Sequence, residues 1–206
     1  PLSGTIAAVT IKDSNTLDLK ALTLTGDLNV TAGGAVTNSG TLVIPGTATI
    51  SASSQAVTLN ESSNNFGTAA ITGANVAITD TNAIILGAST VSGTYSVTAG
   101  GAVTNSGTQE ITGITTISAS GHNVTLDTAT NNFANEVRIT GAVVTVVDED
   151  AINLGASTVS GAYSVTAGGA VTNSGALVIP NTTTISAVNG SNVKQDVTLA
   201  TATNNF

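Results

Sequence analysis

The residues of this sequence that could bind a metal ion are aspartates that recur at one equivalent position, each at the start of a polar triplet. Asp148-Glu149-Asp150 follows an alternating apolar run, and Asp13 and Asp80 take the equivalent positions in two similar stretches. An Asp-x-Asn or Asp-x-Asp spacing offers oxygen ligands of the kind that calcium prefers. If the chain binds calcium, this spacing predicts Asp148 and Asp150 as the ligands. An Asx turn at the end of a strand explains the column more simply, because the glycine-rich calcium nonapeptide and the downstream Glu of an EF-hand are missing.

Histidine and paired carboxylates are the next candidates for chemistry. His122 is the one histidine, and Gln55 and Gln195 replace it at the equivalent positions. We interpret His122 as a surface turn residue, because a site built around a lone histidine is rare. Asn60 and Ala200 take the place of Asp127 in the other two copies, so the paired carboxylates that cleave glycosides are not repeated. We expect no enzymatic activity, no catalytic residue and no cofactor-binding residue.

Pairs of asparagine offer a possible contact for carbohydrate. Asn64-Asn65, Asn131-Asn132 and Asn204-Asn205 each precede a phenylalanine. Their amides could bind sugars on the surface, or they could bond along a stack of β-strands as asparagine ladders do. The second interpretation is the one that we expect.

One ten-residue string, TAGGAVTNSG, organises the whole chain. It occupies Thr31–Gly40, Thr98–Gly107 and Thr166–Gly175, so the copies are 67 and 68 residues apart. A string that returns at a fixed period indicates a repeat architecture. We divide the chain, a single segment over residues 1–206, into long repeats at 7–73, 74–141 and 142–206. Because the Asn-Asn-Phe strings return at the same period, we expect Phe66, Phe133 and Phe206 on one side of the molecule.

The composition favours a thin β-solenoid. Of 206 residues, 41% are hydrophobic but only 2% are aromatic, which suits a core of small β-branched side chains. Alternating runs such as Tyr95-Ser96-Val97-Thr98 predict half-buried strands, and Gly, Asn, Asp and Ser between them predict turns. Extra polar residues within Ser186–Leu199 predict a surface loop that leaves the core register intact. The expected fold is all-β, a parallel β-helix of about nine coils, three to each long repeat.

Charge and cysteine content narrow the range of partners. The net charge is −8, and the four cationic residues, Lys12, Lys20, Arg138 and Lys194, are scattered. This argues against binding to nucleic acid or to anionic lipid. No apolar run is long enough to insert into a membrane, and the absence of cysteine leaves no disulfides. The opening on Pro1 and the lack of atypical capping units suggest a processed segment of a longer chain or molecules that stack end to end.

The run Ser-Val-Thr-Ala-Gly-Gly-Ala-Val-Thr-Asn-Ser-Gly, followed by alternating apolar residues at Leu42–Gly46 and Leu177–Asn181, resembles repeats of filamentous-haemagglutinin-like bacterial adhesins. The resemblance implies a right-handed β-helix shaft that is secreted or displayed at a bacterial surface. Members of that family act in adhesion, aggregation and biofilm formation, and none of their binding residues can be carried over.

The resulting expectation is a rigid spacer and self-associating surface within an extracellular bacterial fibre. A filament subunit that stacks end to end and a solenoid that binds polysaccharide are the alternatives. The partners expected are therefore further copies of the chain, or a polysaccharide or cell-surface receptor.

Overall fold

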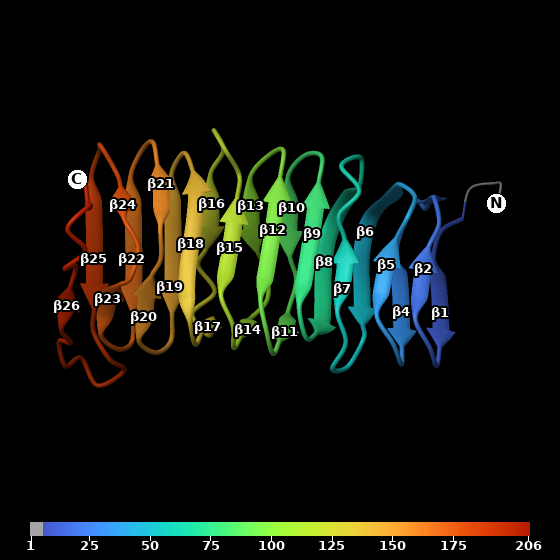
Figure 1. Ribbon diagram of the computed structural model, residues 1–206, viewed down its shortest axis with the longest axis horizontal. Helices are drawn as coiled ribbons and strands as arrows, with labels where there is room; N and C mark the ends of the chain where they lie inside the picture. Colours follow the sequence, from blue (N-terminus) through green and yellow to red (C-terminus); the bar gives the residue numbers. More distant parts are fainter. Residues whose placement is uncertain (1–5) are drawn as a thin grey trace.

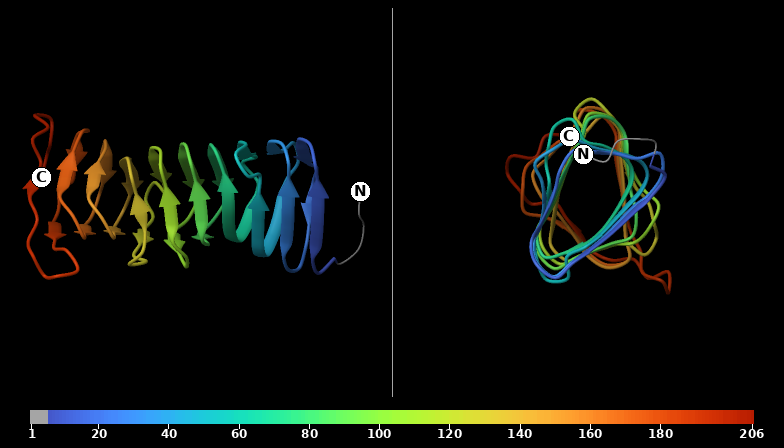
Figure 2. Two further views of the ribbon diagram at one scale, coloured as in Figure 1. Left: turned by 90° about the horizontal axis from the view of Figure 1, so that it is seen from below. Right: turned by 90° about the vertical axis from the view of Figure 1, so that its right-hand side faces the viewer.

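The structure, a computed structural model, describes residues 6–206 as a rod of stacked coils, with β1 (Val9–Asp13) at one end and β26 (Val197–Thr198) at the other (Figure 1). Viewed along the rod, the coils superpose on one closed outline (Figure 2). The ladders between the strands are parallel, and they form two sheets of 14 and 12 strands. The described residues form strands, turns and bends without any helix, so none of them builds a helix that could cross a membrane.

The strands are short, and most contain two to five residues. The first sheet contains β1 (Val9–Asp13), β3 (Leu22–Thr23), β4 (Leu28–Ala32), β6 (Leu42–Ser51), β8 (Asn65–Gly73), β10 (Ile84–Leu86), β11 (Ser89–Val91), β13 (Val103–Asn105), β14 (Gln109–Ile111), β16 (Val124–Leu126), β17 (Asn132–Phe133), β19 (Val144–Asp148), β22 (Tyr163–Ala167) and β25 (Thr183–Ala187). The second sheet contains β2 (Leu17–Leu19), β5 (Val36–Asn38), β7 (Val57–Leu59), β9 (Val76–Asp80), β12 (Tyr95–Ala99), β15 (Thr115–Ser118), β18 (Glu136–Gly141), β20 (Ile152–Leu154), β21 (Ser157–Val159), β23 (Val171–Asn173), β24 (Leu177–Val178) and β26 (Val197–Thr198).

The pairing register sets the length of a coil. Thr10 pairs with Asn29, 19 residues later, and Thr116 pairs with Arg138, 22 residues later. The main path through each sheet passes ten strands, so the described chain makes nine steps from the first coil to the last. At a strand spacing of about 4.8 Å, nine steps span roughly 43 Å. The prediction of an all-β parallel solenoid with about nine turns is confirmed.

Alternation along each strand builds the core. In β12, Tyr95, Val97 and Ala99 point inward and are buried, whereas Ser96 and Thr98 point outward. Val97 lies in the ladder between Ile78 and Ile117, and each of these three side chains is at most 2% exposed. Such inward columns remove apolar surface from water along the whole rod, which is the main favourable contribution to folding.

The long repeat does not contain a whole number of coils. In the second repeat, β9 pairs with β12, β12 with β15 and β15 with β18, so a coil closes after every three strands. The strands β9 to β18 number ten, and ten strands make three and one third coils. Each long repeat is therefore rotated by about one third of a turn relative to the preceding one, and the expectation of three coils per repeat is wrong.

The rotation also corrects the expected placement of the phenylalanines. Phe66 stacks on Ile44, Phe133 stacks on Ile111, and Phe206 follows Asn205, which bridges to Val178 of the second sheet. These are three different columns of the rod. The period of a sequence repeat reports where similar residues recur, whereas the side of the rod that they occupy depends on the length of a coil.

Close approach between coils explains the first glycine of each Gly-Gly pair in the repeated string. A Cβ atom at Gly33, Gly100 or Gly168 would lie 2.3, 2.2 or 1.9 Å from a backbone oxygen in the preceding coil. These glycines have no positive φ, and among the described glycines only Gly121 has one, at 77°. Steric contact, and not a left-handed turn, therefore requires glycine at these positions.

The extra residues near the carboxyl end form the predicted loop. Val188 and Lys194 make an antiparallel bridge, and Asn192 adopts a φ of 59° within the loop between them. The ladder then resumes, since Val197 pairs with Val171. The core register is kept, as the sequence predicted.

Candidate functional site

Buried asparagines connect neighbouring coils. Asn64 is fully buried, and its Oδ1 accepts hydrogen bonds from Asn38 Nδ2 at 2.9 Å and from the Leu42 backbone N–H at 2.9 Å. Its Nδ2 donates to the Leu59 carbonyl at 3.2 Å, and Asn38 Nδ2 also donates to the Gly40 carbonyl at 2.9 Å. We call this pair of side chains with its backbone partners the asparagine clasp. It ties the repeated string to the Asn-Asn-Phe string of the next coil.

The same clasp occurs once in each long repeat. The side-chain pairs are Asn38–Asn64, Asn105–Asn131 and Asn173–Asn204, with Nδ2 to Oδ1 distances of 2.9, 2.9 and 3.0 Å. Asn64 and Asn131 are fully buried, so they cannot bind carbohydrate at the surface. The prediction that these amides bond along the stack is confirmed for the first asparagine of each string.

Buried carboxylates make a second kind of contact, between one long repeat and the next. Asp80 Oδ2 accepts a hydrogen bond from the Phe66 backbone N–H at 2.6 Å, and Asp148 Oδ2 accepts one from Phe133 N–H at 2.9 Å. The Oδ1 atoms of these residues accept the N–H groups two residues further on, at 2.9 and 2.8 Å. Both aspartates are only 2% exposed. Each one therefore forms an Asx turn and also holds the end of the preceding repeat.

Burial shifts the protonation of these carboxyl groups. Desolvation raises the pKa of Asp80, although the hydrogen bonds from Phe66 and Asn82 oppose the shift. Desolvation also raises the pKa of Asp148, to about 6, and the nearby charges of Asp150 and Glu149 contribute in the same direction. Hydrogen bonding to the carboxylate offsets only part of the cost of burying its charge.

The proposed calcium ligands lie in different environments. Asp148 is buried, and both of its carboxylate oxygens accept backbone hydrogen bonds, whereas Asp150 is exposed. The equivalent Asp13 also forms the Asx turn, because its Oδ1 accepts the Asn15 N–H at 2.8 Å. Within residues 6–206, no group of three or more His, Asp or Glu side chains is placed to hold a metal ion. Calcium binding at Asp148 and Asp150 stays a prediction.

The remaining candidates for chemistry lie apart from one another. His122 is exposed in a turn in which its backbone N–H donates to the Ala119 carbonyl at 2.8 Å. Asp127 is exposed beyond β16. Arg138 Nη2 makes an ion pair with Glu136 Oε2 at 2.6 Å on the outer surface, so the charge of Arg138 is neutralised within the molecule.

Two buried serines are structural residues that the repeat pattern alone did not identify. Ser89 Oγ accepts the Ile71 N–H at 3.1 Å, and Ser157 Oγ accepts the Ile139 N–H at 3.0 Å. Each serine begins the second of two short strands that pair with the two ends of one long strand, and its hydroxyl accepts the N–H group in the gap between these ladders. A signal was present in the sequence, because Ser89 and Tyr95 recur together as Ser157 and Tyr163, while the first repeat has leucine at both positions, Leu22 and Leu28.

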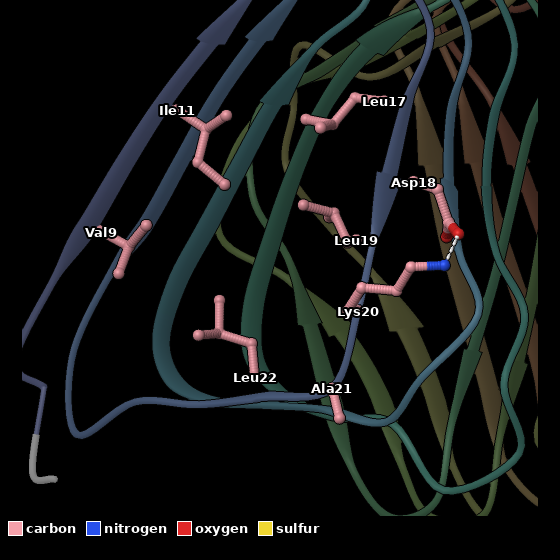
Figure 3. A pocket seen from close by; sticks show the side chains of 8 residues that line it. All are labelled: Val9, Ile11, Leu17, Asp18, Leu19, Lys20, Ala21 and Leu22. Atoms are coloured by element: carbon pink, nitrogen blue, oxygen red, sulfur yellow. Dashed lines mark hydrogen bonds and ion pairs between the residues drawn. The ribbon is translucent and has the colours of Figure 1, made fainter. Parts of the chain in front are cut away.

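The two ends of the rod expose parts of the apolar core. At the amino end, Val9, Ile11, Leu17 and Leu22 line a hollow of about 280 Å³ within the first coil (Figure 3). At the carboxyl end, Ile185, Leu199 and Phe206 line a hollow of about 420 Å³ together with Asn181 and Thr183. Apart from the exposed Phe206, these apolar side chains are half-buried, because among residues 6–206 each has a neighbouring coil on one side only.

Comparison with known proteins identifies the repeats but not a named relative. The profile of a family described as repeats of unknown function, DUF5649, matches residues 6–72, 73–140 and 140–206. No curated protein and no solved structure matches the chain. The matched boundaries differ by at most two residues from the repeat limits expected from the sequence.

Proposed function

The chain belongs to the DUF5649 family of repeats, and on this premise we propose that it is a rigid structural segment of an extracellular bacterial fibre or adhesin. Its role is mechanical: it holds apart whatever lies at its two ends. The resemblance of the repeated string to adhesin shafts supports the extracellular placement. The continuous stack of parallel coils supports the role of a spacer.

Continuity across the repeat boundaries is the observation that carries this proposal. The boundary between the first two matched repeats lies at the end of β8, and the next boundary lies within β18. Both boundaries are crossed by continuous ladders and by the carboxylate contacts of Asp80 and Asp148. A rod of this kind has no flexible linker at which it can bend between repeats.

The distribution of aromatic side chains gives the polysaccharide alternative less support. Sugar-binding faces gain from aromatic rings that stack against the sugar, and such rings must be accessible. Tyr95, Tyr163, Phe66 and Phe133 are all buried in the core, and the exposed Phe206 lies in the last coil and not along a face of the rod. The outer faces instead present short hydroxyl side chains such as Thr98 and Thr158.

Electron microscopy of chains with different numbers of repeats tests the spacer role. Deletion of residues 74–140 removes one repeat of three and one third coils, so the rod should shorten by about 16 Å, at about 4.8 Å a coil. Duplication of the same residues should lengthen it by the same amount while it stays straight. A change in length with visible bending at the repeat boundaries, or a compact particle, would contradict the proposal.

A further inference from the structure

We propose that Asn189 is a site of covalent self-modification, at which the chain converts this asparagine to aspartate or isoaspartate through a cyclic imide. The site lies in the loop between Val188 and Lys194, in the polar insertion that the third long repeat adds. The inference goes beyond the role of a spacer and does not depend on it. The substrate is the Asn189-Gly190 pair itself, and water is the further reactant.

The sequence contains one Asn-Gly pair, Asn189-Gly190. A glycine after asparagine leaves its own backbone nitrogen unhindered, because glycine has no Cβ atom and adopts a wide range of backbone angles. That nitrogen can attack the Cγ atom of the asparagine side chain and close a ring. The pair is therefore the place in this chain where such a reaction meets the least steric resistance.

The reaction needs the side chain of Asn189, the backbone nitrogen of Gly190 and water. The nitrogen loses its proton to hydroxide and bonds to Cγ, the Cγ–Nδ2 bond breaks, and ammonia leaves with a proton taken from water. A second water molecule then opens the imide. Cleavage of the new Cγ–N bond gives aspartate, and cleavage of the original backbone C–N bond gives isoaspartate.

Two backbone N–H groups are directed at the oxygen atom that becomes negatively charged during the attack. Asn189 Oδ1 accepts the Ser191 N–H at 3.1 Å and the Val193 N–H at 2.9 Å. Paired donors of this kind stabilise the oxyanion of a tetrahedral intermediate in acyl transfer. The left-handed φ of 59° at Asn192 turns the chain so that Val193 faces Asn189. These contacts lie within the loop, so the loop itself supplies the geometry.

The attacking and leaving groups carry no competing hydrogen bond. Among residues 6–206, the Gly190 backbone N–H donates to no acceptor, and Asn189 makes its side-chain hydrogen bonds through Oδ1 alone. A Cβ atom at Gly190 would meet nothing within 4 Å, so the space around the attacking nitrogen is open.

The asparagines of the clasp show the opposite arrangement, because both the attacking and the leaving group are held. Each of these asparagines precedes a serine whose backbone N–H donates to a carbonyl of the preceding coil; the serines are Ser39, Ser106 and Ser174, at 3.1, 2.9 and 3.0 Å. The asparagine Nδ2 atoms also donate within the clasp. In the folded chain, modification is therefore expected at Asn189 and not in the clasps.

Modification changes the surface of the rod and leaves its shape intact. Either product adds one negative charge to a chain whose net charge is −8, and isoaspartate also lengthens the backbone of the loop by one carbon atom. The ladder resumes beyond the loop, where Val197 pairs with Val171, so the coils do not depend on the bonds within the loop.

Peptide mapping by mass spectrometry tests the proposal on the purified chain after prolonged incubation at about pH 8. The expected result is a mass increase of about 1 Da in the peptide that contains Asn189, with release of ammonia. Gly190→Ala should slow the reaction about tenfold, because the added methyl group fits the open loop but hinders ring closure. Ser191→Ala keeps the backbone N–H and is the matched control, whose rate should stay unchanged.

Unfolding and a second pair of variants separate the geometry of the loop from the Asn-Gly pair alone. In urea concentrated enough to unfold the rod, the two donors are lost, so the rate at Asn189 should fall about tenfold while the clasp asparagines begin to react. Asn192→Gly permits the left-handed backbone, whereas Asn192→Val disfavours it and should react about tenfold more slowly than Asn192→Gly. An unmodified Asn189, a rate no faster in the folded chain than in urea, or equal rates in the two Asn192 variants would overturn the proposal.

Discussion

Asn105 donates a side-chain hydrogen bond to Asn131 Oδ1 at 2.9 Å, from one coil of the rod to the next. Asn131 Oδ1 also accepts the Gln109 backbone N–H at 3.0 Å, and its Nδ2 donates to the Leu126 carbonyl at 3.2 Å. A single buried amide therefore satisfies polar groups from three segments. Asparagine suits this position, because its short side chain carries both an amide donor and a carbonyl acceptor.

Replacement of Asn131 by alanine should destabilise the rod by about 3 kcal/mol, because three hydrogen bonds are lost and the Gln109 N–H is left buried without an acceptor. Urea denaturation measures the change in the free energy of unfolding. Asn132→Ala is the matched control, because Asn132 points outward and its side chain makes one exposed contact, at 3.3 Å. That control should lose less than about 0.5 kcal/mol. Equal losses in the two variants would show that the clasp does not hold the coils together.

The buried carboxyl group of Asp148 should make the stability of the rod depend on pH. Its pKa is raised to about 6 in the fold by desolvation, whereas an aspartate in an unfolded chain has a pKa of about 3.9. The folded state therefore favours the protonated form. The stabilisation from this group is fully present below about pH 4 and is lost as the pH rises through about 6.

The measurement compares the free energy of unfolding at about pH 4.5 and pH 7.5 in the original chain and in Asp148→Asn. The difference between the two chains should change by about 2 kcal/mol over this range, because the asparagine cannot titrate. Asp127→Asn is the control, since Asp127 is exposed beyond β16 and is not among the charges that shift the pKa of Asp148. A pH dependence that is the same with and without the Asp148 carboxyl group would refute the assignment.

Ser89 should contribute more to the stability of the fold than the small size of its side chain suggests. Its Oγ is the acceptor for the Ile71 N–H, and Ser89→Ala would leave that N–H buried and unpaired. The expected cost is about 2 kcal/mol. The Gly87 carbonyl accepts a hydrogen bond from Ser89 Oγ at 3.1 Å, and without that hydroxyl it still accepts one from Gln109 Nε2 at 2.7 Å. Thermal unfolding checks the result against Ser92→Ala at an exposed turn, which should melt within about 1 °C of the original chain.

The strands and their inward faces could be predicted because they depend on local alternation. The string Tyr95-Ser96-Val97-Thr98 gives the buried and exposed sides of β12 correctly, and Asn64 and Asn131 were correctly interpreted as structural. The burial of Asp80 and Ser89 was not foreseen. A polar residue that follows a strand has the same sequence signature in an exposed turn as in a buried one, and only the neighbouring coil decides between them.

The position of each repeat around the rod also could not be predicted from the period. The chain spends three strands on each coil, and the repeat contains ten, so equivalent residues such as Val30 and Val97 lie in different sheets. The number of residues on each side of a coil depends on how tightly the turns pack on the preceding coil. Those contacts, such as Gly100 against Thr81, are visible only in three dimensions.

Disulfide cross-linking tests the pairing register from which this rotation follows, because the chain contains no cysteine of its own. Thr98 and Ser118 pair in neighbouring coils on the outside of the second sheet. Paired residues of adjacent strands lie about 5 Å apart at Cα, which is within the range that a disulfide spans. The double variant Thr98→Cys and Ser118→Cys should therefore oxidise readily to an intramolecular disulfide, detected by mass spectrometry.

The equivalent positions of two long repeats should behave differently. Thr31 and Thr98 occupy the same place in the repeated string, but they lie three and one third coils apart and in different sheets. The double variant Thr31→Cys and Thr98→Cys should stay reduced under the same conditions, since about 16 Å along the rod is far beyond the reach of a disulfide. Spin labels at Thr31, Thr98 and Thr166 refine the test, because rotation places each neighbouring pair further apart than the axial rise alone. Distances equal to the axial rise would put equivalent residues back on one side of the rod and would refute the rotation.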